Sequence, residues 1–549
     1  MLRHILATAL VAAGGIFTAE ACTSLIATRG ATENDAVMVT YAADSHTLYG
    51  ELYHQPAADY PEGAMRKVYE WDTGKYLGEI PEVRHTYSTV GNMNEHGLTI
   101  AESTWGGRPE LEGSGLIDYG SLIYITLQRA KTAREAVDIM TDLVKQYGYS
   151  SSGESFSIAD PNEAWIMELI GKGKDDPGAV WVARRVPEGH ISGHANHSRI
   201  HQFPLNEPAT TIYSPDVIDF ARSKGYFNGK DEDFSFSSAY AELDGSALRG
   251  CDGRVWSFYN KYNPDMGPYL DWILQGKGEP LPLWIKPSRK LSARDMQAMM
   301  RDHFEGTPMD MTLDIGAGPW KVPYRWRTMT YDVDSVTYYN ERAIATQQTG
   351  FSFVSEMRAD APDAMRGVLW FGVDDANTCV YVPMYSCLTE VPHEFAPGNG
   401  DMLDLSWDAA FWVTNYVANQ AYNRYSLMIP DIRRVQNSME DSIAAEVDRL
   451  YATVGDMSPT VARSILNRHS ADWSKKYVDS YKKLGDYLLV KYLDGNRKKT
   501  DEQGNFLRTP EGMAVSPDFP GYDEKYYRSI VNDPDGGDRL KLLIIEQKD

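Results

Sequence analysis

Cysteine is scarce in this chain. Only four occur among 549 residues, at Cys22, Cys251, Cys379 and Cys387. So few cysteines exclude a scaffold built on disulfides, and a chain of this length can bury enough apolar surface without one. A bridge between Cys379 and Cys387 is not expected, because "CVYVPMYSC" predicts extended chain that holds the two residues too far apart.

Positive charge and long apolar runs are also in short supply. Lys and Arg number 54 against 77 Asp and Glu, which gives a formal net charge of -23. Nucleic acids and anionic membrane surfaces bind positive patches, so neither is an expected partner. Beyond residue 21 no stretch is apolar enough to cross a bilayer. The 42% hydrophobic content instead predicts a soluble globular protein with a large core.

The first 21 residues have the pattern of an export signal. Arg3 provides a positive start, Ile5 to Phe17 form a short apolar core, and Ala19 and Ala21 are the small residues that signal peptidase requires. Cleavage after Ala21 would make Cys22 the first residue of the mature chain. We therefore expect residues 1–21 to be a signal peptide and the mature protein to be exported, either periplasmic or secreted.

Strand patterns begin directly at Cys22. The segments "CTSLIATR" and "AVMVTYAA" predict a hairpin, "SFSIADPNEAWIMELIG" a second hairpin around "DPNE", and "AVWVARRV" a further strand. Between them, Ser121 to Tyr147 has helical spacing, with Thr132 and Glu135 placed as a capping box for its second half. Strands joined by tight turns and covered by amphipathic helices predict an α+β sandwich of antiparallel sheets.

The rest of the chain is first β-rich and then helical. The segments "SVTYYNERAIATQQTGFSFVSEMR" and "GVLWFGVDDANTCVYVPMY" alternate in the strand pattern and are expected to complete the sheets. From about Leu405, three stretches carry an apolar stripe at helical spacing. They are "SWDAAFWVTNYVANQAYNRY", "SMEDSIAAEVDRLYATVG" and "SADWSKKYVDSYKKLGDYLLVKYLDG".

Three interpretations compete for Cys22: a structural cysteine, a lipid attachment site, and a catalytic N-terminal nucleophile. Lipid attachment needs an aliphatic residue three places earlier and small residues between, and the charge of Glu20 opposes it. The nucleophile has a mechanism, since an α-amine with a pKa near ~8 can accept the thiol proton without a separate histidine. Donors for the oxyanion and a group that orients the amine must then come from elsewhere in the chain.

Four segments carry a resemblance to a known family: "ACTSLIATRGATENDAVMVTYAADSH", "NMNEHGLTIAEST", "AWIMELIGKG…WVARRVPEGHISGHANHSRI" and "GCDGRVWSFYN". Together they resemble the dipeptidase branch of the cysteine N-terminal nucleophile (Ntn) hydrolases, a superfamily that includes penicillin V acylases and bile salt hydrolases. The likeness runs from Cys22 to the "VYVPMY" region and loosely beyond. It implies an αββα sandwich of two antiparallel sheets as a catalytic domain over 22–404, with the helical region 405–549 packed on it.

The resemblance also implies roles for particular residues. Cys22 would be the nucleophile, Asp44 the acid that orients its amine, Asn196 the side-chain amide of the oxyanion hole, and Arg254 the arginine that supports the nucleophile electrostatically. Thr104 falls near a second polar position that lines the substrate site. No metal or other cofactor is implied. Without the resemblance, the ordinary roles are the favoured interpretation: Asp44 as a turn acid, Asn196 as a loop residue, Arg254 in a surface ion pair and Thr104 as a strand hydroxyl.

The sequence departs from the family pattern at Tyr41. Many relatives carry an arginine three residues before the aspartate that corresponds to Asp44. A tyrosine cannot supply that charge, so the pKa of Cys22 and the details of substrate recognition are left open.

A zinc site is the rival interpretation for His190, His194, His197 and His201, whose spacing would align them on one face of a helix. The surrounding glycines and the preceding strand-like segment oppose a helix. In a strand the first two would face away from the last two. A metal site is therefore not expected.

The expected function is an exported cysteine dipeptidase that hydrolyses dipeptides or other very short peptides through a thioester acyl-enzyme on Cys22. The alternatives are an N-acyl or bile-acid amide hydrolase of the same superfamily, and a non-catalytic lipoprotein anchored through Cys22. The preferred dipeptides and the oligomeric state, including a homo-oligomer, are left open.

Overall fold

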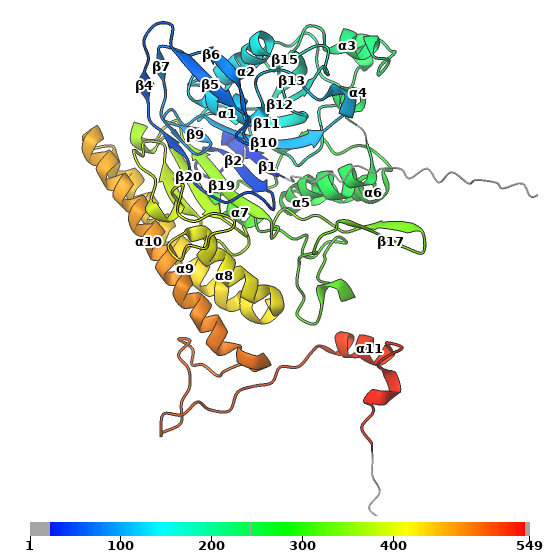
Figure 1. The fold of residues 1–549 in the computed structure, drawn as a ribbon, viewed down its shortest axis with the longest axis vertical. Helices are drawn as coiled ribbons and strands as arrows, with labels where there is room; N and C mark the ends of the chain where they lie inside the picture. The colour runs from blue at the N-terminus through cyan, green and yellow to red at the C-terminus, as the bar shows by residue number, and fades with distance from the viewer. Residues whose placement is uncertain (1–21, 242, 544–549) are drawn as a thin grey trace, which may run out of the picture.

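A computed structural model describes residues 22–241 and 243–543. The expected signal peptide over 1–21 and its cleavage site lie outside the described residues. Two large antiparallel sheets form the centre of the molecule, and helices cover their outer faces (Figure 1). The α+β class with antiparallel sheets is thus confirmed.

The first sheet has seven strands and contains the hairpin that follows Cys22. In order across the sheet, these are β16 (Trp284–Ile285), β14 (Ile191–His194), β1 (Ser24–Ala27), β2 (Val37–Asp44), β19 (Thr349–Met357), β20 (Gly367–Val373) and β21 (Val382–Tyr385). Strands β1 and β2 pair antiparallel through Ile26↔Val39, as the sequence predicted.

The second sheet has eight strands. In order, these are β15 (Thr211–Tyr213), β13 (Ala179–Arg185), β12 (Ala164–Gly171), β11 (Gly153–Ala159), β10 (Thr99–Gly106), β9 (Met93–Asn94), β8 (Thr89–Val90) and β3 (His54–Gln55). The predicted hairpin around "DPNE" is the pair β11 and β12, which is confirmed.

Alternation of side chains along β12 shows how the layers stack. Ile166 and Ile170 belong to the core that the two sheets share, whereas Trp165, Met167 and Leu169 belong to a second core under the helices. Successive residues of a strand point to opposite faces, so one strand supplies both cores. Strands β1 and β2 contact β10 and β11 across the shared core.

Helices α1 (Tyr119–Leu127) and α2 (Ala133–Tyr147) contact the outer face of the eight-stranded sheet. The predicted start of α2 is confirmed, because the Thr132 side chain accepts a hydrogen bond from the Glu135 backbone. The Glu135 carboxylate accepts from the backbone of Lys131 at 2.8 Å, one residue before the position that a capping box requires.

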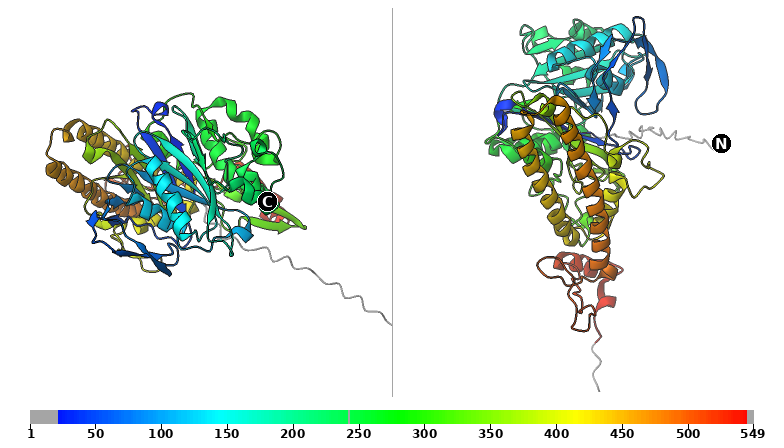
Figure 2. Two further views of the ribbon diagram at one scale, coloured as in Figure 1. Left: turned by 90° about the horizontal axis from the view of Figure 1, so that it is seen from above. Right: turned by 90° about the vertical axis from the view of Figure 1, so that its left-hand side faces the viewer.

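The outer side of the seven-stranded sheet is covered by α7 (Ala293–Met299), α8 (Ala410–Asn423), α9 (Tyr425–Val454) and α10 (Pro459–Lys491). The long helices α9 and α10 lie side by side along one flank (Figures 1 and 2). Helix α9 begins earlier than the sequence pattern predicted and continues through Pro430, a residue that usually ends or kinks a helix.

Six further helical elements come between or after the strands already described along the chain. They are α3 (Val217–Ser223), α4 (Phe236–Tyr240), the π-helical turn η4 (Ser246–Asp252), α5 (Gly253–Tyr262), α6 (Leu270–Gln275) and α11 (Glu524–Asn532). Helix α11 lies at the end of the molecule farthest from the eight-stranded sheet (Figures 1 and 2). In the described part of the chain, no helix combines the length and apolarity needed to cross a membrane.

Three short hairpins stand apart from the large sheets. They are β4 (Ala58–Asp59) with β7 (His85–Thr86), β5 (Met65–Tyr69) with β6 (Tyr76–Pro81), and β17 (Thr330–Val333) with β18 (Val336–Tyr339). The expectation that "SVTYY" completes a main sheet was therefore wrong. Its strand pairs with β17 instead, and the exposed rings of Tyr331 and Tyr338 stack on each other across this hairpin.

Candidate active site

Cys22 lies two residues before β1, where the first two strands begin to pair. Thr23 and Ala42 form a bridge between them, which fixes the backbone one residue after the cysteine. The Cys22 side chain is buried, with 6% of the residue exposed. Its sulfur lies 3.5 Å from the hydroxyl of Tyr41 and near the backbone N–H of Asp44, which favours the thiolate.

The surroundings of the Cys22 thiol hold it protonated. Burial raises its pKa well above the ordinary value, and the negative charges of Glu102 and Asp44 raise it further. A thiol attacks a carbonyl as a thiolate. The site therefore suits a mechanism in which a base removes the proton during attack, rather than one with a preformed thiolate.

Asp44 ends β2 and is held in one orientation. One carboxylate oxygen accepts a hydrogen bond from the guanidinium of Arg342 at 2.6 Å, and the other accepts from the hydroxyl of Thr349 at 2.6 Å. The residue is 1% exposed. Burying a charge is costly unless it is paired and hydrogen-bonded, and Arg342 and Thr349 meet that requirement.

Arg254, at the start of α5, joins the beginning of β1 to the loop after β14. One guanidinium nitrogen donates to the Cys22 carbonyl and to the Thr23 hydroxyl, each at 2.7 Å. Another donates to the Asn196 side-chain oxygen at 2.9 Å. Burial lowers the pKa of Arg254, and the nearby charge of Arg342 lowers it further. Arg254 thus fixes the position of Cys22 and Asn196 together.

Asn196 follows β14 in the left-handed backbone region, with φ of 59°, which asparagine tolerates better than most residues. Its amide nitrogen donates to the Thr104 carbonyl at 2.5 Å, and its backbone N–H donates to the Ser103 hydroxyl at 3.2 Å. The amide predicted to stabilise an oxyanion is therefore anchored on β10, between Thr104 and Arg254.

Thr104 lies at a register irregularity near the end of β10. Its hydroxyl donates to a carboxylate oxygen of Glu154 at 2.7 Å. Contacts thus run from Cys22 through Arg254 and Asn196 to Thr104, while Asp44 meets the thiol through its backbone. The structure brings all five residues singled out in the sequence into one connected cluster.

Two buried glutamates beside this cluster were missed in the sequence. Glu102 on β10 accepts a hydrogen bond from the Tyr41 hydroxyl, and its charge acts on the Cys22 thiol. Glu154 on β11 lies close enough to Glu102 for each carboxyl to affect the other. The available signal was a charged residue inside each of the otherwise uncharged strand segments "TIAESTW" and "GESFSIA", since strand interiors seldom bury a charge without a purpose.

The side chain of Tyr41 lies between Cys22 and Glu102. Its hydroxyl joins the thiol of Cys22 to the carboxylate of Glu102. Burial raises the pKa of Tyr41 well above its ordinary value, and the neighbouring Cys22 and Glu102 raise it further, so the phenol stays neutral. Tyr41 can therefore donate a hydrogen bond in this site but cannot supply a charge.

His194 anchors the far side of the cluster. Its two ring nitrogens meet the hydroxyls of Ser103 and Ser157, at 2.6 Å and 2.8 Å. Burial lowers the pKa of His194 to about 3, and the charge of Arg199 contributes. His197 pairs instead with Asp252 at 2.9 Å. Within the described residues no group of histidine, cysteine and acidic side chains is arranged to hold a metal ion.

The buried His194 predicts a loss of stability in acid. Below pH ~6.5 an unfolded chain protonates this histidine, whereas the folded protein does so only near pH 3. The free energy of unfolding should therefore fall as the pH drops from about 6.5 towards 3, by up to about 1.4 kcal/mol per pH unit from this residue. Urea unfolding of the wild type and of His194→Gln at pH 6.5, 5.5 and 4.5 measures it. The variant should lose less stability over this range, and equal losses would contradict the assignment.

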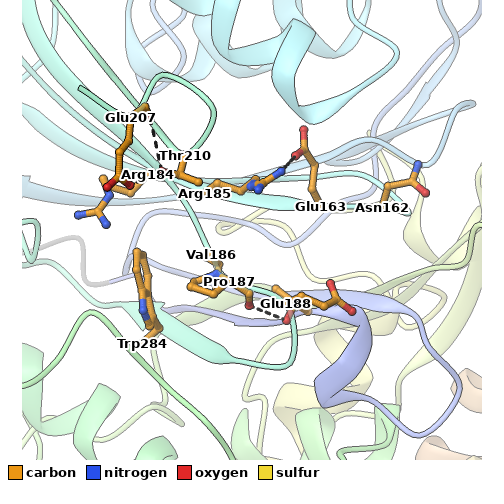
Figure 3. Close-up of a pocket in the computed structure, with 11 residues that line it drawn as sticks. Asn162, Glu163, Arg184, Arg185, Val186, Pro187, Glu188, Glu207, Thr210 and Trp284 are labelled. Atoms are coloured by element: carbon orange, nitrogen blue, oxygen red, sulfur yellow. Dashed lines mark hydrogen bonds and ion pairs between the residues drawn. The ribbon is translucent and has the colours of Figure 1, made fainter. Parts of the chain in front are cut away.

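A separate cavity opens at the other end of β1 (Figure 3). It has a volume of about 430 Å³. Thr28 lies on its wall, six residues after Cys22, which corresponds to roughly 20 Å along a strand. Its charged side chains include the Arg185–Glu163 ion pair and Arg184, whose guanidinium lies 5.0 Å from the centre of the Trp284 ring. No cysteine lines this cavity, so it is not the candidate site for thiol chemistry.

All four cysteines are free thiols. Cys379 and Cys387 are at opposite ends of the β21 segment, and both have pKa values raised by burial. Cys251, in the π-helical turn η4, lies against Arg254. Among these thiols, Cys22 is the one that lies beside Tyr41, Asp44 and Glu102.

Comparison with known proteins identifies the family. The model of Peptidase family C69 matches residues 21–438, and the chain belongs to this family. The chain is 25% identical over 387 residues to a "Probable dipeptidase" of Latilactobacillus sakei, covering 67% of this chain and 74% of the relative. It is 24% identical over 337 residues to a "Probable dipeptidase" of Salmonella dublin, covering 59% and 67%. It is 22% identical over 454 residues to "Probable dipeptidase A" of Streptococcus pyogenes serotype M3, covering 79% and 89%.

Proposed function

We propose that this protein is a cysteine dipeptidase whose nucleophile is the thiol of Cys22. The observation that carries the proposal is the position of this thiol: buried at the start of β1, in contact with Tyr41 and the Asp44 backbone, and fixed through its carbonyl by Arg254. Membership of Peptidase family C69 and the names of the relatives support the reaction class.

We propose further that cleavage after Ala21 frees the α-amine of Cys22. This amine takes the thiol proton as the sulfur attacks the peptide carbonyl carbon. The carbonyl π electrons move to oxygen, which gives a tetrahedral intermediate. The α-amine, now an ammonium, donates its proton to the leaving nitrogen as the carbonyl re-forms and the C–N bond breaks. The C-terminal amino acid leaves, and the N-terminal residue remains as a thioester on Cys22. Water then attacks the thioester with the same amine as base, which releases the first amino acid and restores the thiol.

The surrounding residues have defined tasks in this mechanism. The carboxylate of Asp44 is placed by Arg342 and Thr349 to orient and stabilise the ammonium form of the amine. The amide of Asn196 donates to the developing oxyanion, a contribution that is worth roughly 10²- to 10³-fold in rate where it has been measured. Arg254 donates hydrogen bonds to both Asn196 and Cys22 and so holds them at a fixed separation. The two face-to-face sheets with outer helices would then be the αββα sandwich of an Ntn hydrolase.

A substrate panel tests this function against the amidase alternative. The panel sets unmodified dipeptides with small, acidic, basic and aromatic side chains against their N-acetylated forms and glycine-conjugated bile acids. We expect kcat/KM to be highest for a free dipeptide. Turnover of the acylated compounds that equals or exceeds that of every free dipeptide would refute the proposed function and favour the amidase.

A further inference from the structure

We propose that the buried carboxyl pair Glu102 and Glu154, with the hydroxyl of Tyr41, forms the subsite that binds the free α-ammonium group of the substrate. The proposal rests on the proposed dipeptidase function and assigns the recognition of the substrate N-terminus to this chain's own residues. It accounts for the two charged side chains that the reaction at Cys22 does not otherwise use.

The register of the eight-stranded sheet places the two carboxyls together. Thr104 on β10 is directly opposite Glu154 on β11, and Glu102 is two residues from Thr104 on the same face of β10. Among the described residues, β10 pairs with β9 only at Thr99↔Met93. Glu102 lies three residues further along β10, where β9 no longer pairs with this edge of the strand. Tyr41, from the other sheet, meets the Glu102 carboxylate there. The pair is therefore adjacent to the nucleophile.

One oxygen of Glu154 receives no hydrogen bond from a donor among the described residues, and the Glu102 carboxyl lies close to this side chain. Its Oε1 accepts from Thr104 at 2.7 Å, whereas its Oε2 is buried without a hydrogen-bond donor in the part of the chain that the structure describes. The residue is fully buried, and no basic side chain among the described residues forms an ion pair with it. A buried carboxylate in this condition costs several kcal/mol unless a proton or a cation reaches it.

The buried glutamates outside this pair have their hydrogen-bond donors in the fold itself. Glu168 accepts from the Ser198 hydroxyl and from the backbone of Arg199, while Glu440 pairs with Arg301 at 2.5 Å. These side chains need nothing from outside the molecule. The contrast with Glu154 indicates that its free oxygen serves a ligand.

Electrostatics agree with a cationic ligand. Burial raises the pKa of Glu154 well above its usual range, and the charge of Glu102 raises it further. Two carboxyls that repel each other in a buried site are stabilised when a cation lies between them. An α-ammonium group also has three N–H donors, which suit carboxylate oxygens and the lone pairs of a phenol such as that of Tyr41.

The distances that a dipeptide requires fit this position. The ammonium nitrogen and the carbonyl carbon under attack are both bonded to the first Cα, which separates them by about 2.5 Å. The attacking sulfur lies roughly 3 to 3.5 Å from that carbon. The ammonium must therefore bind within a few ångströms of the sulfur, and the Tyr41 hydroxyl, 3.5 Å from the sulfur, is in contact with Glu102.

The test compares two substrates in three forms of the full mature protein. The substrates are alanyl-alanine and N-acetyl-alanyl-alanine, which differ in the charge at the amine, and kcat/KM is measured for each. The proteins are the wild type, Glu154→Gln, and Glu163→Gln as a control in the turn of the same β11–β12 hairpin. Glutamine keeps the shape of the side chain and removes its charge.

We expect the wild type to prefer the free dipeptide, and Glu154→Gln to lower this preference by roughly 10- to 100-fold, the usual effect of losing a hydrogen bond to a charged group. Glu163→Gln should retain the preference. A Glu154→Gln protein that hydrolyses dipeptides with the wild-type preference would overturn the subsite and leave the dipeptidase function intact. A wild type that prefers the acetylated substrate would instead overturn both.

A binding measurement keeps the proposal testable if Glu154→Gln does not fold. Calorimetry on the Cys22→Ala protein, which cannot form the thioester, compares the binding of the same two compounds. Alanyl-alanine should bind at least about 10-fold more tightly than its acetylated form. Equal affinity for the two compounds would overturn the ammonium subsite.

Discussion

Replacing Cys22 by alanine or serine should lower kcat for dipeptide hydrolysis by about 10³-fold or more, while the protein folds normally. The reaction is proposed to pass through a thioester on this sulfur, and removal of a covalent nucleophile elsewhere costs 10⁴-fold or more. The side chain lies at the start of β1 and is small, so alanine leaves little empty volume. The check is steady-state kinetics, with a thermal unfolding curve to confirm the fold.

The matched control for this experiment is Cys387→Ser. Cys387 is a partly buried thiol outside the cluster around Cys22. Cys251 is a poorer control because it lies against Arg254, which holds the Cys22 carbonyl. Cys387→Ser should keep near wild-type turnover. Turnover within a few fold of wild type in a folded Cys22→Ala protein would exclude Cys22 as the nucleophile.

The second large effect concerns the residue before Cys22. A chain that retains Ala21 should be nearly inactive, because the nitrogen of Cys22 is then an amide and cannot accept a proton near neutral pH. The buried thiol has a raised pKa and depends on a base, so losing the amine should cost roughly 10²- to 10⁴-fold in kcat. Asp44 would remain in place but would have no ammonium to stabilise.

Blocking maturation provides this protein. Replacing Ala21 by a large residue should prevent cleavage by signal peptidase. A protease site inserted directly before Cys22 then gives the rescue, since cutting there exposes the cysteine as residue one. Activity should return on cutting. An uncut protein with full activity, shown by mass spectrometry to carry the preceding residue throughout, would refute the role of the amine.

Local patterns in the sequence predicted the elements that frame the site. The hairpin after Cys22, the "DPNE" hairpin and the start of α2 at Thr132 all depend on neighbouring residues, so a single sequence contains the information. The "SVTYY" strand was assigned to the main sheets, which was wrong, because alternation shows that a segment is extended but not which strand it pairs with.

The contacts that complete the site join residues far apart in the chain. Asp44 meets Arg342, which lies 298 residues later, and Cys22 meets Arg254 after 232 residues. No spacing rule connects such positions. The resemblance to a family predicted Asp44, Asn196 and Arg254, whereas Arg342 belongs to none of the segments that carry the resemblance and is brought to Asp44 only by the fold.

The carboxyl pair shows a second limit of sequence reasoning. Glu102 and Glu154 become neighbours through the register of β10 with β11, which brings Glu154 opposite Thr104. A shift of one residue would turn Glu154 to the opposite face of the sheet. The fold also shows what Tyr41 does at the position where the family resemblance led us to expect an arginine. Its neutral hydroxyl lies between the Cys22 thiol and the Glu102 carboxylate and contacts both.

The most direct test of the nucleophile is mass spectrometry of the protein quenched in acid during turnover of an amino acid ester, whose alcohol leaves readily and so favours accumulation of the acyl-enzyme. The proposed mechanism predicts an N-terminal peptide that begins at Cys22 and carries the mass of one aminoacyl group as a thioester, removed by hydroxylamine. A peptide that begins before Cys22, a diacylglyceryl group on its sulfur, or an acyl group on any other residue would contradict the mechanism.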